Sequence, residues 1–215
     1  MLLATIFVDF NLVFLFDILG TIIFALTGAI SGIKLKLDWL GIIVFSSIVG
    51  IGGGMLRDTI IGCVPVSALQ NEVYLLSCIF IGIISILFGS FIKNHEQLIL
   101  YLDAFGLGVF TAIGCEKGLL FELGSVGIIL CGILTATGGG ILRDVLSKKI
   151  PHVLTHDFYA TASLIGGIFF IFCLEILCLS MFNRFLFVTI LVTSIRILAM
   201  KFKFKLPHVK WKTIY

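Results

Sequence analysis

A seven-residue stretch occurs twice in this chain, each time inside strongly apolar sequence. Both copies read Gly-Gly-Gly-x-Leu-Arg-Asp, and they begin at Gly52 and Gly138, which is an offset of 138 − 52 = 86 residues. The same offset relates Asp17 to Asp103, Gly20 to Gly106, Phe24 to Phe110, Gly28 to Gly114, Gly41 to Gly127, and Pro65 to Pro151. So many matches at one spacing, without insertions, predict an internal duplication.

The apolar character of the chain indicates which class of protein carries this duplication. Of its 215 residues, 60% are hydrophobic and only 13% are charged, whereas a soluble domain carries about 25% charged residues. We therefore expect an integral membrane protein, whose length allows about seven spans of roughly 20 residues each. The net charge of +3 comes mostly from the C-terminal tail and does not favour nucleic-acid binding.

The cysteines and the first ten residues give two further indications about this membrane protein. The six cysteines lie in or beside apolar segments without a Cys-x-x-Cys pair, which favours packing over a disulfide framework or a metal site. Residues 1–10 hold no lysine or arginine, so we expect them to lead into the first span rather than to form a signal peptide.

The apolar sequence divides into seven expected spans. They lie at about residues 10–33, 39–62, 73–92, 98–116, 123–147, 157–180 and 183–200. We therefore expect an all-α membrane protein of seven transmembrane helices. Its parts are a three-helix repeat over 10–92, a second over 98–180, a seventh helix over 183–200 and a basic tail over 201–215.

The basic residues outside the spans predict the orientation in the membrane. If the tail is cytoplasmic, that side holds 10 lysines, against Lys117 and Arg184 on the outer side. We expect a multi-pass protein of the cell (inner) membrane, and the positive-inside rule predicts that its N-terminus lies outside and its C-terminus in the cytoplasm. Because each repeat contains three spans, the second must cross the membrane in the opposite direction. Such inverted repeats are common in transporters, whose sites lie where the repeats meet.

The glycine triplets, Gly52 to Gly54 and Gly138 to Gly140, form the first candidate site. Glycine costs about 1 kcal/mol relative to alanine inside a helix, so three in a row predict a kink or a break in the second and fifth spans. A break frees backbone carbonyls that can bind a cation and amides that favour an anion. The alternative is a close helix crossing, which also requires small residues.

The Arg-Asp pairs that follow the triplets form the second candidate site. Charged residues at such depths in a membrane usually face a bundle interior or an aqueous cavity and find partners there. We expect Arg57 and Asp58 to form a constriction toward the outer face, and Arg143 and Asp144 a matching one toward the inner face. The alternative is that each arginine extends to the lipid headgroups while each aspartate caps its helix.

Asp17 and Asp103 lie on small-residue faces of their helices, because each is followed by Gly, Phe and Gly at i+3, i+7 and i+11. A buried carboxylate needs a donor, and the arginine of the matching repeat is one candidate. A structural ion pair and a ligand for a transported ion both remain open. Lys117, whose counterpart is Ser31, either has a function or anchors its helix at the interface.

Other polar residues carry weaker signals. His152 and His156 are four residues apart but have no further ligand set, so an interfacial loop is the expected interpretation. Glu175 lies in the sixth span without a counterpart in the first repeat. We find no phosphate-binding loop, nucleophile elbow or metalloprotease helix, so we expect no enzyme, no cofactor and no resident metal.

The paired Gly-Gly-Gly-x-x-Arg-Asp…Pro motifs, with Asp-x-x-Gly-x-x-x-Phe upstream in each half, resemble the prokaryotic branch of the trimeric intracellular cation (TRIC) channel family. The duplicated unit of that family is also labelled a glycine transporter domain. The resemblance covers about residues 10–180. It implies a homotrimer with an ion path in each protomer, kinks at the glycine triplets, and conduction of K⁺ and Na⁺. Animal members carry Lys-Glu-Val in the fourth span, where this chain has Glu116-Lys117-Gly118.

Three hypotheses follow from the residues and the resemblance. The first is a passive channel for K⁺ and Na⁺ as transient ions, in which the aspartates neutralise Arg57, Arg143 and Lys117. The second is a secondary transporter of a small zwitterion such as glycine, with the substrate carboxylate held at half-helix N-termini. The third is a structural membrane protein whose glycines only permit tight crossings. The expected partners are two further copies of the chain and membrane lipid.

Overall fold

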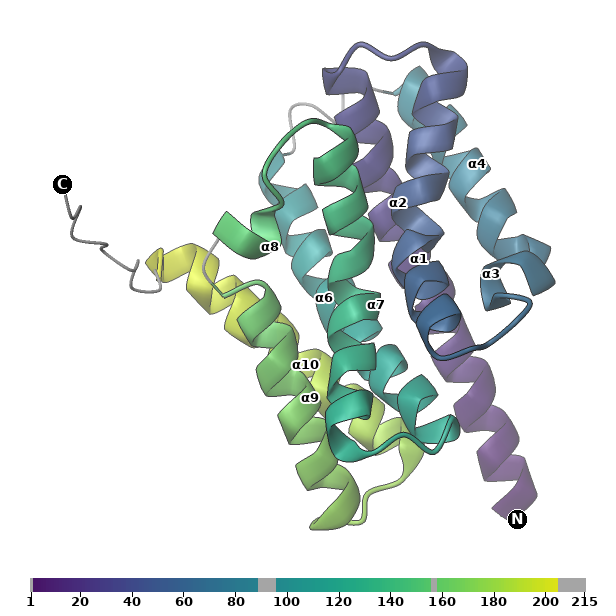
Figure 1. The fold of residues 1–215 in the computed structure, drawn as a ribbon, viewed down its shortest axis with the longest axis vertical. Coiled ribbons are helices and arrows are strands. Elements are labelled where there is room, and N and C mark those ends of the chain that lie inside the picture. The colour runs from purple at the N-terminus through teal and green to yellow at the C-terminus, as the bar shows by residue number, and fades with distance from the viewer. Residues whose placement is uncertain (1, 89–95, 156–157, 205–215) are drawn as a thin grey trace, which may run out of the picture.

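The computed structural model describes residues 2–88, 96–155 and 158–204, and the regular structure within them is helical (Figure 1). The helices, labelled as in Figure 1, are α1 Leu2–Lys34, α2 Trp39–Ile60, α3 Ser67–Gln70, α4 Glu72–Leu87, α6 Glu96–Leu120, α7 Ser125–Leu146, α8 His152–Thr155, α9 Ala160–Glu175 and α10 Met181–Phe202. Residues 89–92 of the third expected span, His156, and residues 205–215 of the tail lie outside the described residues.

Five of these helices are long and apolar enough to cross a membrane. They are α1 from Leu12 onward, α2, α6 from Gln97 onward, α7 and α10. Helices α4 and α9 are apolar but only 16 residues long, or about 24 Å at 1.5 Å per residue. The chain is thus an all-helical membrane protein, and the count of seven spans stays a prediction.

The sixth expected span, at about residues 157–180, is longer than the helix that it contains. Helix α9 ends at Glu175 rather than near residue 180. The Leu177 amide closes its last turn on the Phe172 carbonyl (3.2 Å), and Cys178 then adopts a left-handed φ of 46°. Hydropathy alone could not predict the end of this helix, because the residues that form the turn after it are also apolar.

The 86-residue offset relates the ends of the helices. Helices α2 and α7 begin at 39 and 125 and end at 60 and 146, so both bounds differ by 86. Lys36 and Glu122 (122 − 36 = 86) adopt left-handed φ angles of 58° and 54° in the two corresponding turns. The α1–α2 turn and the α6–α7 turn lie at opposite ends of the bundle (Figure 1). This placement is what inverted repeats would produce, and the inverted arrangement and its orientation in a membrane stay predictions.

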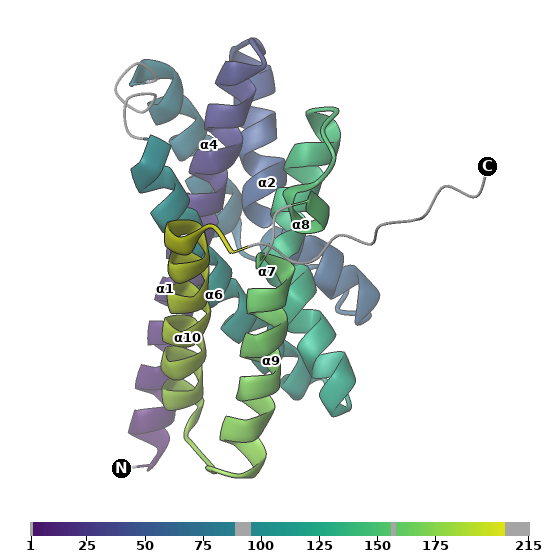
Figure 2. The same ribbon diagram turned by 90° about the vertical axis from the view of Figure 1, so that its left-hand side faces the viewer.

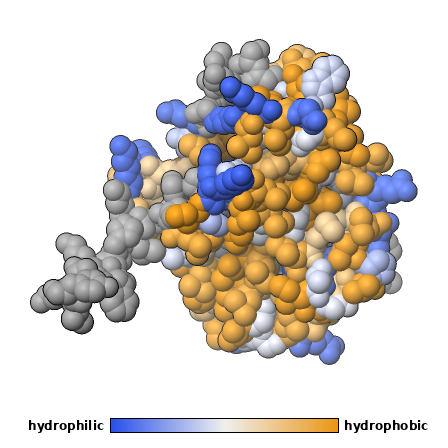
Figure 3. All heavy atoms as spheres, turned by 45° about the horizontal axis from the view of Figure 1, so that its top comes forward, coloured by the Kyte–Doolittle hydropathy of each residue, from blue (hydrophilic) through white to orange (hydrophobic). Residues whose placement is uncertain are grey.

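Helix α10 has no counterpart in the repeat. It lies beside α6 and α9 (Figure 2), so it covers the second half of the chain. The surface is largely apolar over most of the view in Figure 3. Large apolar side chains such as Leu40, Ile60 and Phe80 are exposed by more than 60%. A surface of this kind suits hydrocarbon or a protein partner rather than water.

The sequence predicted a kink or a break at the glycine triplets. The break is wrong, and a kink stays a prediction. Helices α2 and α7 pass through Gly52 to Gly54 and Gly138 to Gly140 without interruption. Tertiary packing explains why glycine is present there. A Cβ on Gly53 would overlap the Thr135 carbonyl oxygen of the facing helix, and a Cβ on Gly139 would overlap the Val49 carbonyl oxygen. The triplets permit a close crossing of two continuous helices.

Candidate functional site

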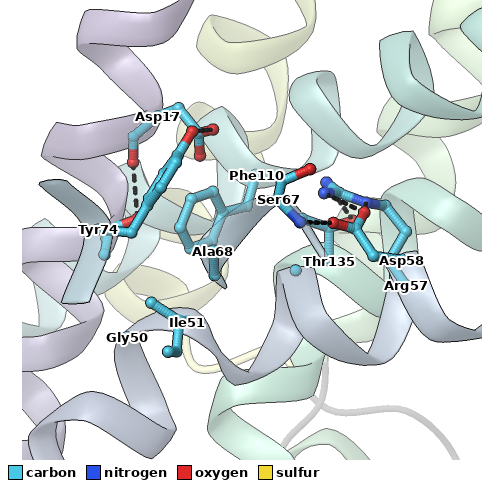
Figure 4. A pocket seen from close by; sticks show the side chains of 12 residues that line it. Asp17, Gly50, Ile51, Arg57, Asp58, Ser67, Ala68, Tyr74, Phe110 and Thr135 are labelled. Carbon is cyan, nitrogen blue, oxygen red and sulfur yellow. Dashed lines mark hydrogen bonds and ion pairs between the residues drawn. The ribbon is translucent and has the colours of Figure 1, made fainter. Parts of the chain in front are cut away.

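The first polar cavity lies where α1, α2, α3, α4, α6 and α7 meet, and we call it the Arg57 cavity (Figure 4). It consists of two adjoining hollows of about 30 and 170 Å³. The residues that line both hollows are Asp17, Arg57, Ser67 and Tyr74. The Phe110 side chain reaches into the same space (Figure 4).

Arg57 and Asp58 form a close ion pair in this cavity. The Arg57 Nε and Nη2 atoms both donate to Asp58 Oδ1, at 2.9 and 2.7 Å. The two side chains are only 7% and 1% exposed. Arg57 Nη1 also lies 3.5 Å from the Thr135 hydroxyl on α7. A buried arginine is thus neutralised by its own neighbour in the sequence, as its depth in the bundle requires.

A chain of hydrogen bonds extends from Asp58 to Lys117. The Ser67 amide at the start of α3 donates to Asp58 Oδ2 at 2.8 Å. The Lys117 ammonium donates to the Ser67 hydroxyl at 3.1 Å, and its Nζ lies 5.7 Å from the centre of the Phe121 ring. Lys117 therefore reaches into the cavity from α6. The sequence had left open whether this lysine has a function or only anchors its helix.

Asp17 has a different partner from the one considered in the sequence. The Tyr74 hydroxyl of α4 donates to Asp17 Oδ2 at 2.5 Å. Among the described residues, the hydrogen bond to this carboxylate comes from a tyrosine rather than from an arginine. Arg57 lines the same hollow, so its charge is close enough to act on Asp17 through space.

The second polar cavity has about 360 Å³, and we call it the Arg143 cavity. Its charged lining residues are Lys34, Asp103, Arg143, Asp144, Lys149 and Arg196, joined by Thr27, Ser31, Ser147 and Tyr159. Arg143 Nε donates to Asp144 Oδ1 at 3.0 Å, and Arg143 Nη1 lies 3.9 Å from Asp103 Oδ1. Here the predicted pairing of the upstream aspartate with an arginine is present, within the second half of the chain.

A contact between matched residues separates the two cavities. The rings of Phe24 and Phe110 stack with centroids 5.1 Å apart and planes 5° apart. A Cβ on Gly20 would lie 2.8 Å from the Phe110 ring, and one on Gly106 would lie 3.2 Å from the Phe24 ring. Gly53 and Gly139 make the equally reciprocal contacts described above. Reciprocal contacts between residues 86 positions apart are what a two-fold axis through this region produces.

The order of residues along the helices shows that the cavities lie on opposite sides of this contact. On α1, Asp17 and Thr21 line the Arg57 cavity. Thr27, Ser31 and Lys34 line the Arg143 cavity, and Phe24 lies between the two sets. On α6 the order is reversed: Asp103 lines the Arg143 cavity and Lys117 the Arg57 cavity, with Phe110 between them. The two matched sets of charges thus occupy opposite ends of the bundle.

Sequence reasoning missed several residues of the site. Glu116 accepts from Arg184 Nε and Nη2 at 3.1 and 3.0 Å, and both side chains are nearly buried. Arg196 of α10 stacks its guanidinium 4.9 Å from the centre of the Tyr159 ring. A buried arginine in an apolar helix was a usable signal for Arg196, whereas Arg184 was only counted among the basic residues on the outer side.

Two of the weaker sequence signals lie outside this site. Glu175 accepts a hydrogen bond from the Ser125 hydroxyl at 3.4 Å, on the exposed surface. His152 begins the short helix α8. Within the described residues, no group of three or more His, Cys, Asp or Glu is arranged to hold a metal ion.

Comparisons with known proteins agree with this arrangement. A family model described as glycine transporter matches residues 14–90 and again residues 100–175, two stretches that begin 100 − 14 = 86 residues apart. A UPF0126 membrane protein of Vibrio cholerae is 40% identical over 162 residues, which is 75% of this chain and 68% of that protein. The UPF0126 inner membrane protein YadS of Escherichia coli K12 is 34% identical over 202 residues, covering 91% and 95%.

Solved structures share the fold. A structure described as that of a TRIC cation channel superposes with a TM-score of 0.87 at 30% identity, and the match covers 93% of this chain and 98% of the other. The TRIC channel orthologue from Rhodobacter sphaeroides superposes with a TM-score of 0.84 at 29% identity, covering 90% and 100%.

Proposed function

The chain belongs to the TRIC cation channel family, whose repeated unit is described as glycine transporter, and on that premise we propose that it is a homotrimeric channel for monovalent cations. The ion path runs inside each protomer, from the Arg57 cavity to the Arg143 cavity. K⁺ and Na⁺ are the proposed permeating ions.

The observation that carries this proposal is the pair of polar cavities on opposite sides of one aromatic contact. Charged side chains inside a bilayer are costly unless they face water or a partner. The Arg57–Asp58 and Arg143–Asp144 pairs are matched by the duplication and lie at opposite ends of the bundle. A protein that only needed tight helix crossings would gain nothing from two buried charged cavities, because hydrophobic residues pack as well at lower cost.

The stacked rings of Phe24 and Phe110 form the proposed constriction. The side chains are 1% and 6% exposed, which supports a closed constriction between the cavities at this point of the proposed path. Hydrophobic constrictions of this kind gate channels by excluding water. Since α2 and α7 are continuous, cation ligands come from side-chain oxygens of the cavities rather than from carbonyls freed by a helix break.

A path for cations requires that the buried arginines along it be paired with acidic groups. Arg57 and Arg143 would repel cations if they were uncompensated. Each is bound by the aspartate that follows it, and Asp103 lies beside Arg143. The charges of these two arginines are thereby offset at both ends of the path.

Assembly and location are further parts of the proposal. The Rhodobacter sphaeroides relative is described as a trimeric channel. This chain exposes an apolar groove of about 630 Å³ between α2 and α4, closed at one side by Leu142 of α7, which suits a contact between protomers. We place the protein in the cell (inner) membrane, because the Escherichia coli relative is described as an inner membrane protein. The distribution of lysines predicts that the N-terminus lies outside.

The test is current across a planar bilayer that contains the purified protein and a KCl gradient. Discrete current steps that reverse near the K⁺ equilibrium potential are expected. Phe110→Ala removes half of the aromatic contact and should raise the open probability or the step size. The control is Phe80→Ala on α4, whose side chain is 63% exposed and which should behave like the wild type. Absence of steps in all three proteins would contradict the channel.

A second candidate function is a secondary transporter of a small zwitterion such as glycine. The description of the matching family model favours it, and both cavities offer basic groups for a carboxylate and acidic groups for an ammonium. Saturable uptake of labelled glycine into liposomes, without current steps in matched bilayers, would replace the channel by this transporter.

A further inference from the structure

The two cavities carry different net charges although the repeat relates them. The Arg143 cavity has four basic and two acidic lining residues, a formal charge of 4 − 2 = +2. The Arg57 cavity has two basic and three acidic lining residues, a formal charge of 2 − 3 = −1. Arg184, bound to one of these acids, Glu116, brings the latter to zero.

The excess positive charge comes from residues outside the duplicated motif. The matched Arg-Asp pairs and the upstream aspartates contribute equally to both cavities. Lys34 and Lys149 have Leu120 and Cys63 as their counterparts, 86 residues away, so these charges are present in one cavity only. Arg196 lies on α10, which has no counterpart at all.

The positions of these groups place them along the proposed path. Lys149 is exposed and lies just beyond α7, at the mouth of the Arg143 cavity. Arg196 is 9% exposed and lines the same cavity from α10, with its guanidinium against the Tyr159 ring. One charge therefore acts at the entrance and the other inside.

We propose that Lys149 and Arg196 make the cation current asymmetric, so that cations entering through the Arg143 cavity carry a smaller current than cations entering through the Arg57 cavity. This inference rests on the proposed channel function. A positive cavity lowers the local concentration of cations and therefore slows their entry from that end. In the orientation predicted from the lysines, the Arg143 cavity is cytoplasmic, and outward K⁺ current is the smaller one.

The size of the effect follows from the excess charge. Two unit charges taken at about 8 Å from an entering cation lower its occupancy about sixfold in unscreened water and about twofold at 0.1 M salt. The Debye length falls from about 10 Å at 0.1 M to about 3 Å at 1 M salt. Asymmetry that comes from these charges must therefore vanish as the salt concentration rises.

The experiment is single-channel recording in symmetric KCl at equal positive and negative voltages. The ratio of the larger to the smaller step needs no knowledge of how each channel inserted. We expect a ratio of about two or more at 0.1 M KCl, falling toward one at 1 M. Lys149→Gln and Arg196→Gln should each lower the ratio at low salt, and Arg196→Lys, which keeps the charge, should preserve it.

Lys148→Gln is the matched control. Lys148 precedes Lys149 and is exposed, but it does not line the cavity, so its neutralisation should leave the ratio near that of the wild type. Equal steps at low salt in the wild type, a ratio that persists at 1 M KCl, or equal effects of the two lysine variants would each overturn the proposal. Absence of any cation current would instead refute the channel function itself.

Discussion

Replacement of Gly53 by alanine tests whether the glycine triplets serve a close helix crossing. A Cβ at this position would overlap the Thr135 carbonyl oxygen and lie 3.2 Å from the Gly139 amide nitrogen. Both atoms belong to the backbone of α7, which cannot move without separating the helices. Overpacking of this kind costs about 3 kcal/mol at the upper end of its range, and the better helix propensity of alanine returns about 1 kcal/mol. We expect Gly53→Ala to destabilise the protein by about 2 kcal/mol.

The adjacent Gly54 supplies the control. The nearest atom to a Cβ built there is Arg57 Nη2 at 3.7 Å, an ordinary contact, so Gly54→Ala should stabilise the helix by about 1 kcal/mol. In thermal unfolding in detergent, followed by circular dichroism, Gly53→Ala should melt about 4–8 °C below the wild type and Gly54→Ala about 2–4 °C above it. Gly139→Ala should behave like Gly53→Ala. Equal melting temperatures for Gly53→Ala and Gly54→Ala would refute the crossing.

Three further sets of variants test separate parts of the structure. Glu116→Gln breaks a nearly buried ion pair and should lower stability by about 3 kcal/mol or more, with part of the loss recovered when Arg184→Gln is added; additive losses in thermal unfolding would contradict the pairing. Ser46→Ala removes a hydroxyl that lies 3.0 Å from a carbonyl of α1 and from a carbonyl of α4, and should cost about 0.5–1.5 kcal/mol by the same measurement. Asp103→Asn and Asp17→Asn each remove a carboxylate from one cavity and should lower conductance or trimer content; bilayer recording and size-exclusion chromatography that show neither change would exclude a role for these aspartates.

The matched charges were predictable because they recur at a fixed spacing, whereas most of their partners were not. Arg57 and Asp58 are neighbours in the sequence, so their pairing needs no tertiary information. Tyr74 reaches Asp17 from 57 residues away, and Arg184 reaches Glu116 from 68 residues away. The spacing of residues within one helix cannot predict contacts between residues so far apart in the sequence, because such contacts depend on which helices pack together.

The glycine triplets show the limit of propensity as evidence. Three glycines weaken a helix, and the sequence is compatible both with a break and with a close crossing. The outcome depends on whether another backbone lies within reach. Gly139 and Gly53 face each other across α2 and α7, so the contact with the partner helix compensates for the missing side chains and both helices continue.

The sequence by itself determined the membrane class, the duplication and the set of matched charges. Composition excludes a soluble fold, and a constant offset of 86 residues requires no structure to detect. Tertiary structure alone decided where the helices cross, which groups contact Asp17 and Asp103, and how α10 adds Arg196 to one cavity only. The physical reason is that periodicity describes one chain segment at a time, whereas a buried charge or a missing Cβ has meaning only relative to the atoms that another segment brings against it.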